Sequence, residues 1–317
     1  MSRLVCVAPN PAIDRLYEVD RLVPGAIHRP TLSVAVPGGK GLNAARAAHS
    51  LGAEVVVVTI LRGHAGRWIE DQLAERGLRL RAVWAPGETR TCVSIRDPGT
   101  DGLTEIYDRG EPVAPADWAA LESLVSEELA AGAELLTISG GIPPGVDDDA
   151  FARVVRAVHA AGARALVDAY GPGLVGALRE RPWLVKVNEA EAGELLGRPV
   201  EGEGAASEAA AELRHRGADV VIITRGRSGA VALTADGDLR LGPPETIGPY
   251  PVGSGDAFLG GLAAGVLEGH DVIQAVEFAA EVAIASAQVP GPGELSPGAA
   301  RGAARAGNPA RSPPQGP

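Results

Sequence analysis

The sequence predicts an α/β protein built around a mostly parallel central sheet with helices on both faces. Short β-branched or apolar runs alternate along the chain with longer, alanine-rich stretches of helical character. Strands separated by helices at this spacing pair in parallel, and such a sheet is covered on both faces. With 317 residues, the chain is long enough to bury a core of that size.

The elements follow one another in a regular order. Strands are expected at residues 4–8, 55–61, 135–139, 165–168, 184–187, 220–224 and 230–233. Helices are expected at residues 41–51, 65–76, 115–131, 148–161, 189–196, 205–216 and 254–267.

Three segments depart from this rhythm. Residues 14–36 and 82–109 alternate polar and apolar positions with period two and contain no helical stretch. We expect them to pair into a small sheet that stands off the main body as a lid; the alternative is a pair of surface hairpins. Residues 296–317 are rich in Pro, Gly and Ala and are expected to be disordered, because they offer almost nothing to bury.

Composition excludes several classes of partner. The formal net charge is −11, which disfavours nucleic acid and anionic membranes. Aromatic residues make up 3% of the chain, too few for base-stacking platforms. The apolar start, residues 4–8, is too short for a signal peptide, and no apolar run is long enough to cross a bilayer. Cys6 and Cys92 are expected to be buried free thiols, and the protein to be cytoplasmic.

A glycine motif near the end of the chain carries the strongest chemical signal. The segment Y-P-V-G-S-G-D-A-F ends just inside a predicted helix, so Gly253, Ser254 and Gly255 can direct backbone N–H groups at an anion. Asp256 lies in the same turn and is suited to accept a proton from an attacking hydroxyl. The alternative is that Asp256 only caps the helix. Proximity to a helix N-terminus predicts a lowered pKa for Asp256.

An earlier glycine motif, V-P-G-G-K-G-L-N, predicts a second part of the site. Gly38 and Gly39 allow close backbone approach, Lys40 supplies a cation, and Asn43 both donates and accepts hydrogen bonds. Together with Asp14 upstream, these residues suit a polyol. The alternatives are a glycine turn before an amphipathic helix and, for Asp14, a turn residue.

Two further stretches point to nucleotide, metal or phosphate. Asn188 and Glu191 follow a predicted strand on one helical face, and their oxygens suit Mg²⁺; a solvated helix start is the alternative. The loop T-R-G-R-S-G-A includes Arg225 and Arg227, which suggest phosphate contacts in place of a plain hairpin turn. Arg90 is either a solvated charge or, with Arg29 and Lys40, part of a phosphate site.

These motifs together resemble the PfkB (ribokinase-like) carbohydrate kinase family. The resemblance rests on P-G-G-K-G-x-N-x-A-R, K-x-N-x-x-E and V-G-S-G-D-A-F in this order, and it covers residues 4–265. The segments N-P-A-I-D and S-G-G-I-P-P-G-V, with Arg90, resemble the phosphofructokinase and tagatose-6-phosphate kinase branch.

The resemblance implies a fold and an activity. It implies a three-layer ribokinase-like kinase domain over residues 1–295 that uses ATP and Mg²⁺. The substrate would be a ketohexose phosphate: fructose 1-phosphate, fructose 6-phosphate or tagatose 6-phosphate. It also implies a homodimer formed through the lid, which would cover the lid's unpaired edges.

Site residues are implied one position at a time. The catalytic base would be Asp256, with Gly253, Ser254 and Gly255 as the anion hole. The acceptor would be bound by Asp14, Gly38, Gly39, Lys40, Asn43, Arg90 and Ser139. Nucleotide would be bound by Lys186, Asn188, Glu191, Thr224, Gly226 and Gly229, with Asn188 and Glu191 also organising the metal.

Two other functions remain open on the sequence. One is a kinase for an unphosphorylated sugar or a nucleoside on the same fold. The other is a catalytically weak sugar-phosphate sensor. The sensor is suggested by residues 279–293, where Glu281 and a run of apolar residues replace the small and polar residues that the family places near adenine.

Overall fold

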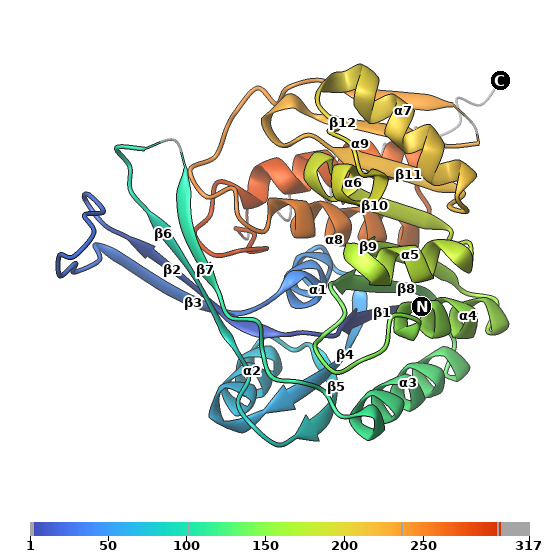
Figure 1. Ribbon diagram of the computed structural model, residues 1–317, viewed down its shortest axis with the longest axis horizontal. Helices are drawn as coiled ribbons and strands as arrows, with labels where there is room; N and C mark the ends of the chain where they lie inside the picture. Colours follow the sequence, from blue (N-terminus) through green and yellow to red (C-terminus); the bar gives the residue numbers. More distant parts are fainter. Residues whose placement is uncertain (1–2, 101, 236, 297, 299–317) are drawn as a thin grey trace, which may run out of the picture.

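The computed structural model describes residues 3–100, 102–235, 237–296 and 298, and shows a large sheet between two layers of helices with a smaller sheet projecting from it (Figure 1). The large sheet has the strand order β13-β12-β11-β10-β9-β8-β1-β4-β5. In chain order its strands are β1 (Arg3–Ala8), β4 (Glu54–Arg62), β5 (Arg79–Ala85), β8 (Ala133–Gly140), β9 (Arg164–Ala169), β10 (Leu184–Asn188), β11 (Val220–Thr224), β12 (Ala230–Leu233) and β13 (Asp238–Leu241).

Most of this sheet is parallel, as the alternation of strands and helices predicts. The pairs from β5 to β11 are parallel, and only β12 and β13 join antiparallel at one edge. From β1 the chain builds outward through β4 to β5, then returns to place β8 on the other side of β1. The strand order therefore reverses between β1 and β8. In open parallel sheets, ligands bind at the carboxyl ends of the strands beside such a reversal.

Two helix layers cover the sheet. One contains α1 (Lys40–Ser50), α2 (Gly63–Glu75), α8 (Ser254–Leu267) and α9 (Val272–Ser286), which pack on one hydrophobic core. The other contains α3 (Pro115–Ala130), α4 (Ala150–Ala160), α5 (Gly171–Arg179), α6 (Glu189–Leu196) and α7 (Gly202–His215).

Strand β1 shows why the sheet needs both layers. Its residues are almost all apolar and buried, with Leu4 and Cys6 in the core under α1 and α8 and Val5 and Val7 in the core under α3 and α4. Side chains alternate across a strand, so a strand without polar positions must be covered on both faces. The three-layer fold implied by the family resemblance is therefore confirmed.

The smaller sheet confirms the predicted lid. It has the order β3-β2-β6-β7, formed by β2 (Ala12–Glu18), β3 (Leu32–Gly38), β6 (Thr91–Arg96) and β7 (Leu103–Tyr107). The central pair β2–β6 is parallel and the outer pairs are antiparallel. The expected start of its second half at Ala82 is wrong, because Ala82 belongs to β5. As an edge strand β5 is half-exposed, so its pattern resembles that of a lid strand.

The sequence interpretation missed four elements. Strands β5 and β13 lie at the two edges of the large sheet, where half-exposed strands lack a continuous apolar run. Helix α5 begins with G-P-G, a pattern typical of a turn. Helix α9 covers residues for which the sequence predicts no element. The predicted disordered tail, 296–317, lies outside the described residues apart from 296 and 298. Among the described residues, no helix is both long and apolar enough to span a bilayer.

Candidate active site

The candidate site lies at the carboxyl edge of the large sheet, beside the reversal between β1 and β8. Ser139 lies near the end of β8, Asp168 lies near the end of β9, and Asn188 ends β10. Helices α1 and α8 begin at the same edge, and both glycine motifs immediately precede or open these helices. The sheet and the helices that start at its edge thus bring together residues as distant in the chain as Asn43 and Asp256, which are 213 positions apart.

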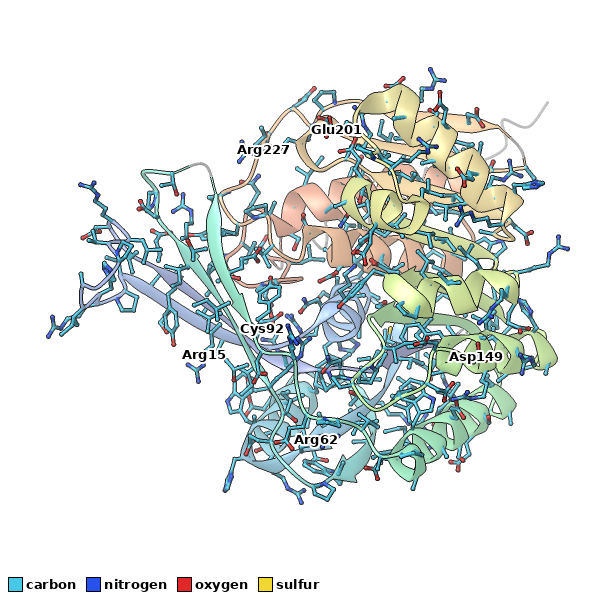
Figure 2. All side chains as sticks on the ribbon, in the orientation of Figure 1. Arg15, Arg62, Cys92, Asp149, Glu201 and Arg227 are labelled. Atoms are coloured by element: carbon cyan, nitrogen blue, oxygen red, sulfur yellow. The ribbon has the colours of Figure 1, made fainter. Side chains whose placement is uncertain are left out.

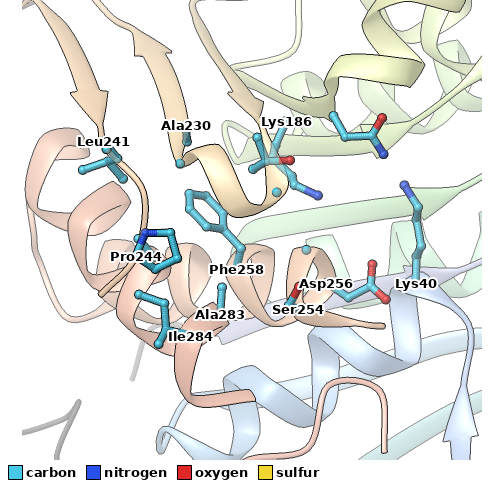
Figure 3. Close-up of a pocket in the computed structure, with 17 residues that line it drawn as sticks. Lys40, Lys186, Ala230, Leu241, Pro244, Ser254, Asp256, Phe258, Ala283 and Ile284 are labelled. Carbon is cyan, nitrogen blue, oxygen red and sulfur yellow. The ribbon is translucent and has the colours of Figure 1, made fainter. Parts of the chain in front are cut away.

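Two cavities meet at this edge. The first, of about 310 Å³, has an apolar wall that includes Phe258, Leu241 and Ile284, and we call it the apolar-walled cavity. Its other end is polar: Figure 3 shows Lys40 and Lys186 extending into it near Asp256. The shape suits a ligand with one flat apolar end and one anionic end.

The second cavity, of about 280 Å³, lies under the small sheet, and we call it the polar cavity. Asp14, Asn43, Arg90 and Ser139 line it. Cys92, which Figure 2 places where the small sheet joins the body, lines it too. Lys40 and Asp256 line both cavities, so a group bound in one could react with a group bound in the other at this junction.

Asp256 is held at the junction by tertiary contacts. Its Oδ2 accepts a hydrogen bond from Asn43 Nδ2 at 2.8 Å, and among the described residues its side chain accepts none from a backbone amide at the start of α8. The capping alternative is therefore wrong. The predicted lowering of its pKa is wrong as well: burial, together with the nearby carboxylate of Asp168, raises the pKa of Asp256 to about 7. Desolvation outweighs the helix dipole and the two lysines.

The start of α8 offers backbone donors beside Asp256. Gly253 adopts φ 80°, and a Cβ there would lie 2.6 Å from the backbone of Pro292 and Gly293. The amide of Ser254 donates to Pro251 O at 3.2 Å. The amides of Gly255 and Asp256 follow in the first turn, where no acceptor within the helix is available. Of the predicted anion hole of Gly253, Ser254 and Gly255, the Ser254 amide is thus engaged, whereas the amide of Gly255 and that of Asp256 have no backbone acceptor among the described residues.

A network of hydrogen bonds fixes the base of the polar cavity. Asp14 Oδ2 accepts from the Gly39 amide at 3.1 Å and from Asn43 Nδ2 at 3.3 Å. A Cβ on Gly38 would lie 2.1 Å from Asp14 Cγ, so only glycine fits beside this carboxylate. Burial raises the pKa of Asp14. The predicted pairing of Asp14 with Asn43 is present in the structure, and Asp14 is more than a turn residue.

Arg46 orients the side-chain amide of Asn43 through a hydrogen bond. Its Nη2 donates to Asn43 Oδ1 at 2.7 Å and to Pro292 O at 2.5 Å, and its Nη1 pairs with Glu294. With Asn43 Oδ1 engaged, the amide nitrogen must face Asp14 and Asp256. The same guanidinium holds the segment that packs against Gly253. Arg46 is the last residue of the motif P-G-G-K-G-x-N-x-A-R, and its contact with Asn43 is not evident from the sequence.

Asp168 is the main site residue that sequence analysis missed. It is fully buried and accepts from Lys40 Nζ at 2.7 Å and from Lys186 Nζ at 2.6 Å. The two ammonium groups keep the pKa of Asp168 below its usual range despite its burial. The only sequence signal is an aspartate at the end of an apolar strand, A-L-V-D-A. Lys40 also bonds Glu191, so one ammonium joins two carboxylates.

Asn188 and Glu191 form a capping box at the start of α6. Asn188 Oδ1 accepts from the Glu191 amide, and Glu191 Oε2 accepts from the Asn188 amide, both at 2.9 Å. Both residues therefore do cap the start of α6, as the alternative interpretation expects. Glu191 Oε1 nevertheless accepts a hydrogen bond from Lys40. Across the described residues no group of three or more His, Cys, Asp or Glu side chains is arranged to hold a metal. The carboxylates of Asp168 and Glu191 do converge on one cation.

Arg90 and Ser139 line the polar cavity, and each has one buried side-chain donor without a partner among the described residues. Arg90 donates to Asp108 O at 2.7 Å and to Asn10 O at 3.0 Å, and its Nε has no partner among the described residues. The buried Ser139 Oγ is likewise without a partner there. Arg90 is therefore held in place by backbone and is not a solvated surface charge.

Some of the residues predicted to contact the nucleotide line the apolar-walled cavity, and others do not. Thr224, Gly226 and Gly229 line the apolar-walled cavity as expected. Arg225 instead pairs with Glu189, and Arg227 lies exposed on the outer edge of the molecule (Figure 2). Glu281 is also exposed. Its neighbours Ala280, Ala283 and Ile284 line the apolar-walled cavity, whereas Glu281 itself does not. The charge of Glu281 therefore gives no reason to expect weak ATP binding.

Comparison with known proteins identifies relatives along most of the chain. The family model described as pfkB family carbohydrate kinase matches residues 2–298. The chain is 33% identical to the 1-phosphofructokinase of Rhodobacter capsulatus over 277 residues, covering 87% of this chain and 88% of that protein. It is 34% identical to the 1-phosphofructokinase of Xanthomonas campestris pv. campestris over 269 residues, covering 83% and 84%.

A solved structure shows the same architecture. The tetrameric inhibited form of phosphofructokinase-2 from Escherichia coli superposes with a TM-score of 0.86 at 25% identity, covering 97% of this chain and 99% of that one. Sequence relatives, fold and glycine motifs agree along nearly the whole chain. This chain therefore belongs to the pfkB family of carbohydrate kinases.

Proposed function

We propose that this kinase transfers the γ-phosphoryl group of ATP to a hydroxyl of a ketohexose phosphate. One observation carries the proposal: Asp256 and Lys40 line both cavities, so a nucleotide in one and a sugar phosphate in the other meet at a base and a cation. The relatives named 1-phosphofructokinase support the choice of acceptor.

The apolar-walled cavity suits ATP. Phe258 and Ile284 supply an apolar wall for the base, while Lys186 reaches the anionic end. Glu191 and Asn188 would organise Mg²⁺, because carboxylate and amide oxygens suit this ion. Asp168 is fully buried and paired with both lysines, so it acts by positioning Lys40 and Lys186. Bound there, Mg²⁺ would neutralise the charge of the phosphates.

The polar cavity suits the acceptor. Asp14 and Asn43 offer a carboxylate and an amide to neighbouring hydroxyls. The free donors of Arg90 and Ser139 would bind the phosphate that the acceptor already carries. An unphosphorylated sugar would leave both donors buried without a partner, which favours the phosphosugar over that alternative.

Proton and phosphoryl transfer are balanced at the junction. The acceptor oxygen forms a bond to the γ-phosphorus, the bond to the bridging β–γ oxygen breaks, and ADP leaves. Asp256 takes the hydroxyl proton, and its pKa of about 7 makes it a stronger base than an exposed aspartate. The amides of Gly255 and Asp256, with Lys40 and Lys186, stabilise the charge that spreads over the transferring group.

The test is a coupled ADP-release screen with fructose 1-phosphate, fructose 6-phosphate, tagatose 6-phosphate, fructose and ribose. We expect one phosphosugar to give the highest kcat/KM. A free sugar as the best acceptor would instead support the unphosphorylated-sugar alternative. Sugar-phosphate binding without ADP release would support the sensor.

We also propose a homodimer that forms through the small sheet. Edge strand β7 exposes Ile106, which is 62% exposed, and the β2–β3 connection exposes Ile27, which is 88% exposed. A second copy would cover these side chains and the unpaired strand edges. Sedimentation at micromolar concentration should show a dimer that Ile106→Glu weakens. A fully active species near the 32.3 kDa chain mass would contradict this arrangement.

The two free cysteines fit a reducing cytoplasm, which we propose as the location of this protein.

A further inference from the structure

Tyr170 is a large aromatic residue in the wall of the polar cavity that the proposed chemistry does not use. It follows β9 directly, at the N-cap position of α5, and its side chain makes no capping hydrogen bond. The side chain is 43% exposed although it lines the cavity with Ser139, Gly140 and Gly141. An aromatic ring kept partly in water beside a ligand cavity is available to contact the ligand.

The ring rests directly on Gly141. A Cβ on Gly141 would lie 2.8 Å from both Cζ and Oη of Tyr170. A side chain at position 141 and the present position of the ring are therefore mutually exclusive. The clash would involve the far end of a movable side chain, so a small residue at 141 would displace the ring at little expense to the fold.

The ring also lies near Lys40, which lines both cavities. Lys40 Nζ lies 5.7 Å from the ring centroid, within the range of a cation–π contact. The ring thus occupies the wall between the reacting end of the polar cavity and the segment from Ser139 to Gly141. No hydrogen bond joins the Tyr170 hydroxyl to another of the described residues, which leaves it free for a ligand.

From this geometry we infer that Tyr170, seated on Gly141, is a specificity-determining residue for the acceptor. Its ring packs against the carbon skeleton of the ketohexose phosphate, and its hydroxyl forms a hydrogen bond with it. The inference rests on the proposed function and adds a contact to the acceptor side only. It predicts effects on acceptor binding and none on nucleotide binding.

The experiment compares Tyr170→Ser, Gly141→Ala and the double variant, using the acceptor that the ADP-release screen identifies. Tyr170→Ser removes the ring and supplies a better N-cap for α5, so frayed helix cannot explain a loss. We expect it to raise the acceptor KM about 10-fold, with kcat and the KM for ATP within about 3-fold of wild type. Gly141→Ala should raise the acceptor KM similarly by displacing the ring.

The double variant is the decisive measurement. If both changes act through the position of the ring, Gly141→Ala has almost no further effect once Tyr170→Ser is present. Multiplicative KM effects, or a wild-type acceptor KM in Tyr170→Ser, would overturn the inference. Val175→Ala, an exposed position on α5 away from both cavities, serves as the matched control and should leave every constant unchanged.

A second readout separates this inference from the proposed function. Calorimetric titration of each variant with the acceptor, without ATP, should reproduce the KM pattern as dissociation constants. Wild-type enzyme that releases no ADP with any acceptor would overturn the proposed function. Active wild type whose acceptor affinity is unaffected by all three variants would overturn only the assignment of Tyr170.

Discussion

The two cavities that meet at Asp256 differ in the chemistry of the side chains that line them. The polar cavity is lined by groups held in hydrogen bonds, such as Asp14, Asn43 and Arg90. The apolar-walled cavity has a wall of aliphatic and aromatic carbon, including Phe258 and Ile284. Hydrogen bonds to charged groups are directional, whereas apolar contact depends mainly on area. Substitutions should therefore do most harm at the junction, less in the polar cavity and least along the apolar wall.

The junction should show the largest effect. Asp256→Asn keeps the shape of the side chain and an oxygen that can accept from Asn43, but it removes the base. We expect kcat to fall at least ~10²-fold, with little change in either KM. Steady-state rates from the ADP-release assay check this. Turnover within a few-fold of wild type would mean that Asp256 does not take the proton.

The pH dependence tests the same residue. Its pKa is raised to about 7, so the ionised, active form increases as pH rises through 7. We expect kcat/KM to fall about tenfold per pH unit below that value. The effect of pH on folding stability has the opposite sign. Because the pKa of Asp256 is raised in the folded protein, the folded state binds this proton more tightly than the unfolded chain does. The resulting contribution to the free energy of unfolding is present at low pH and is lost as pH rises towards and through 7.

Calorimetry separates the stability effect from catalysis. Asp256→Asn should raise Tm relative to wild type at pH 8 and much less at pH 5, because only the ionised buried carboxylate is destabilising. The exposed Asp238→Asn is the matched control and should show no such difference. Equal Tm shifts at the two pH values would contradict the raised pKa.

The polar cavity should show an intermediate effect. Arg90→Ala removes a guanidinium that backbone carbonyls hold in place, and we expect the KM for the phosphosugar to rise about 10-fold. The KM for an unphosphorylated analogue and for ATP should change much less. Arg15→Ala, on the same small sheet but outside the cavity, is the control. A loss of equal size for phosphosugar and free sugar would assign Arg90 a structural function.

The apolar wall should show the smallest effect. Ile284→Ala removes part of the carbon surface beside the nucleotide, and we expect the KM for ATP to rise about 3- to 5-fold with the acceptor KM unchanged. Ile247→Ala, an exposed position outside both cavities, provides the comparison. An effect on acceptor KM alone would mean that the two cavities have been assigned in the wrong order.

The site was predictable where its residues are close in sequence. Gly253, Gly255 and Asp256 form a local motif, because an anion-binding helix start needs small residues and a charge within one turn. Tyr170 and Asp168 were not predictable in this way. Each is a single residue after an apolar strand, and each gains its function only from partners that the sheet brings alongside from other strands and from α1.

The alternation of strands and helices, and with it a mostly parallel sheet covered on both faces, could be determined from the sequence alone, because periodicity and strand spacing are local properties. The exceptions are the edge strands β5 and β13 and the helices α5 and α9. Only the tertiary structure decided that Ala82 belongs to an edge strand of the large sheet, that Glu281 faces away from the cavity, and that Asp256 is buried. The raised pKa of Asp256 has the same origin. A helix N-terminus can be inferred from neighbouring residues, but desolvation depends on atoms that come from distant parts of the chain.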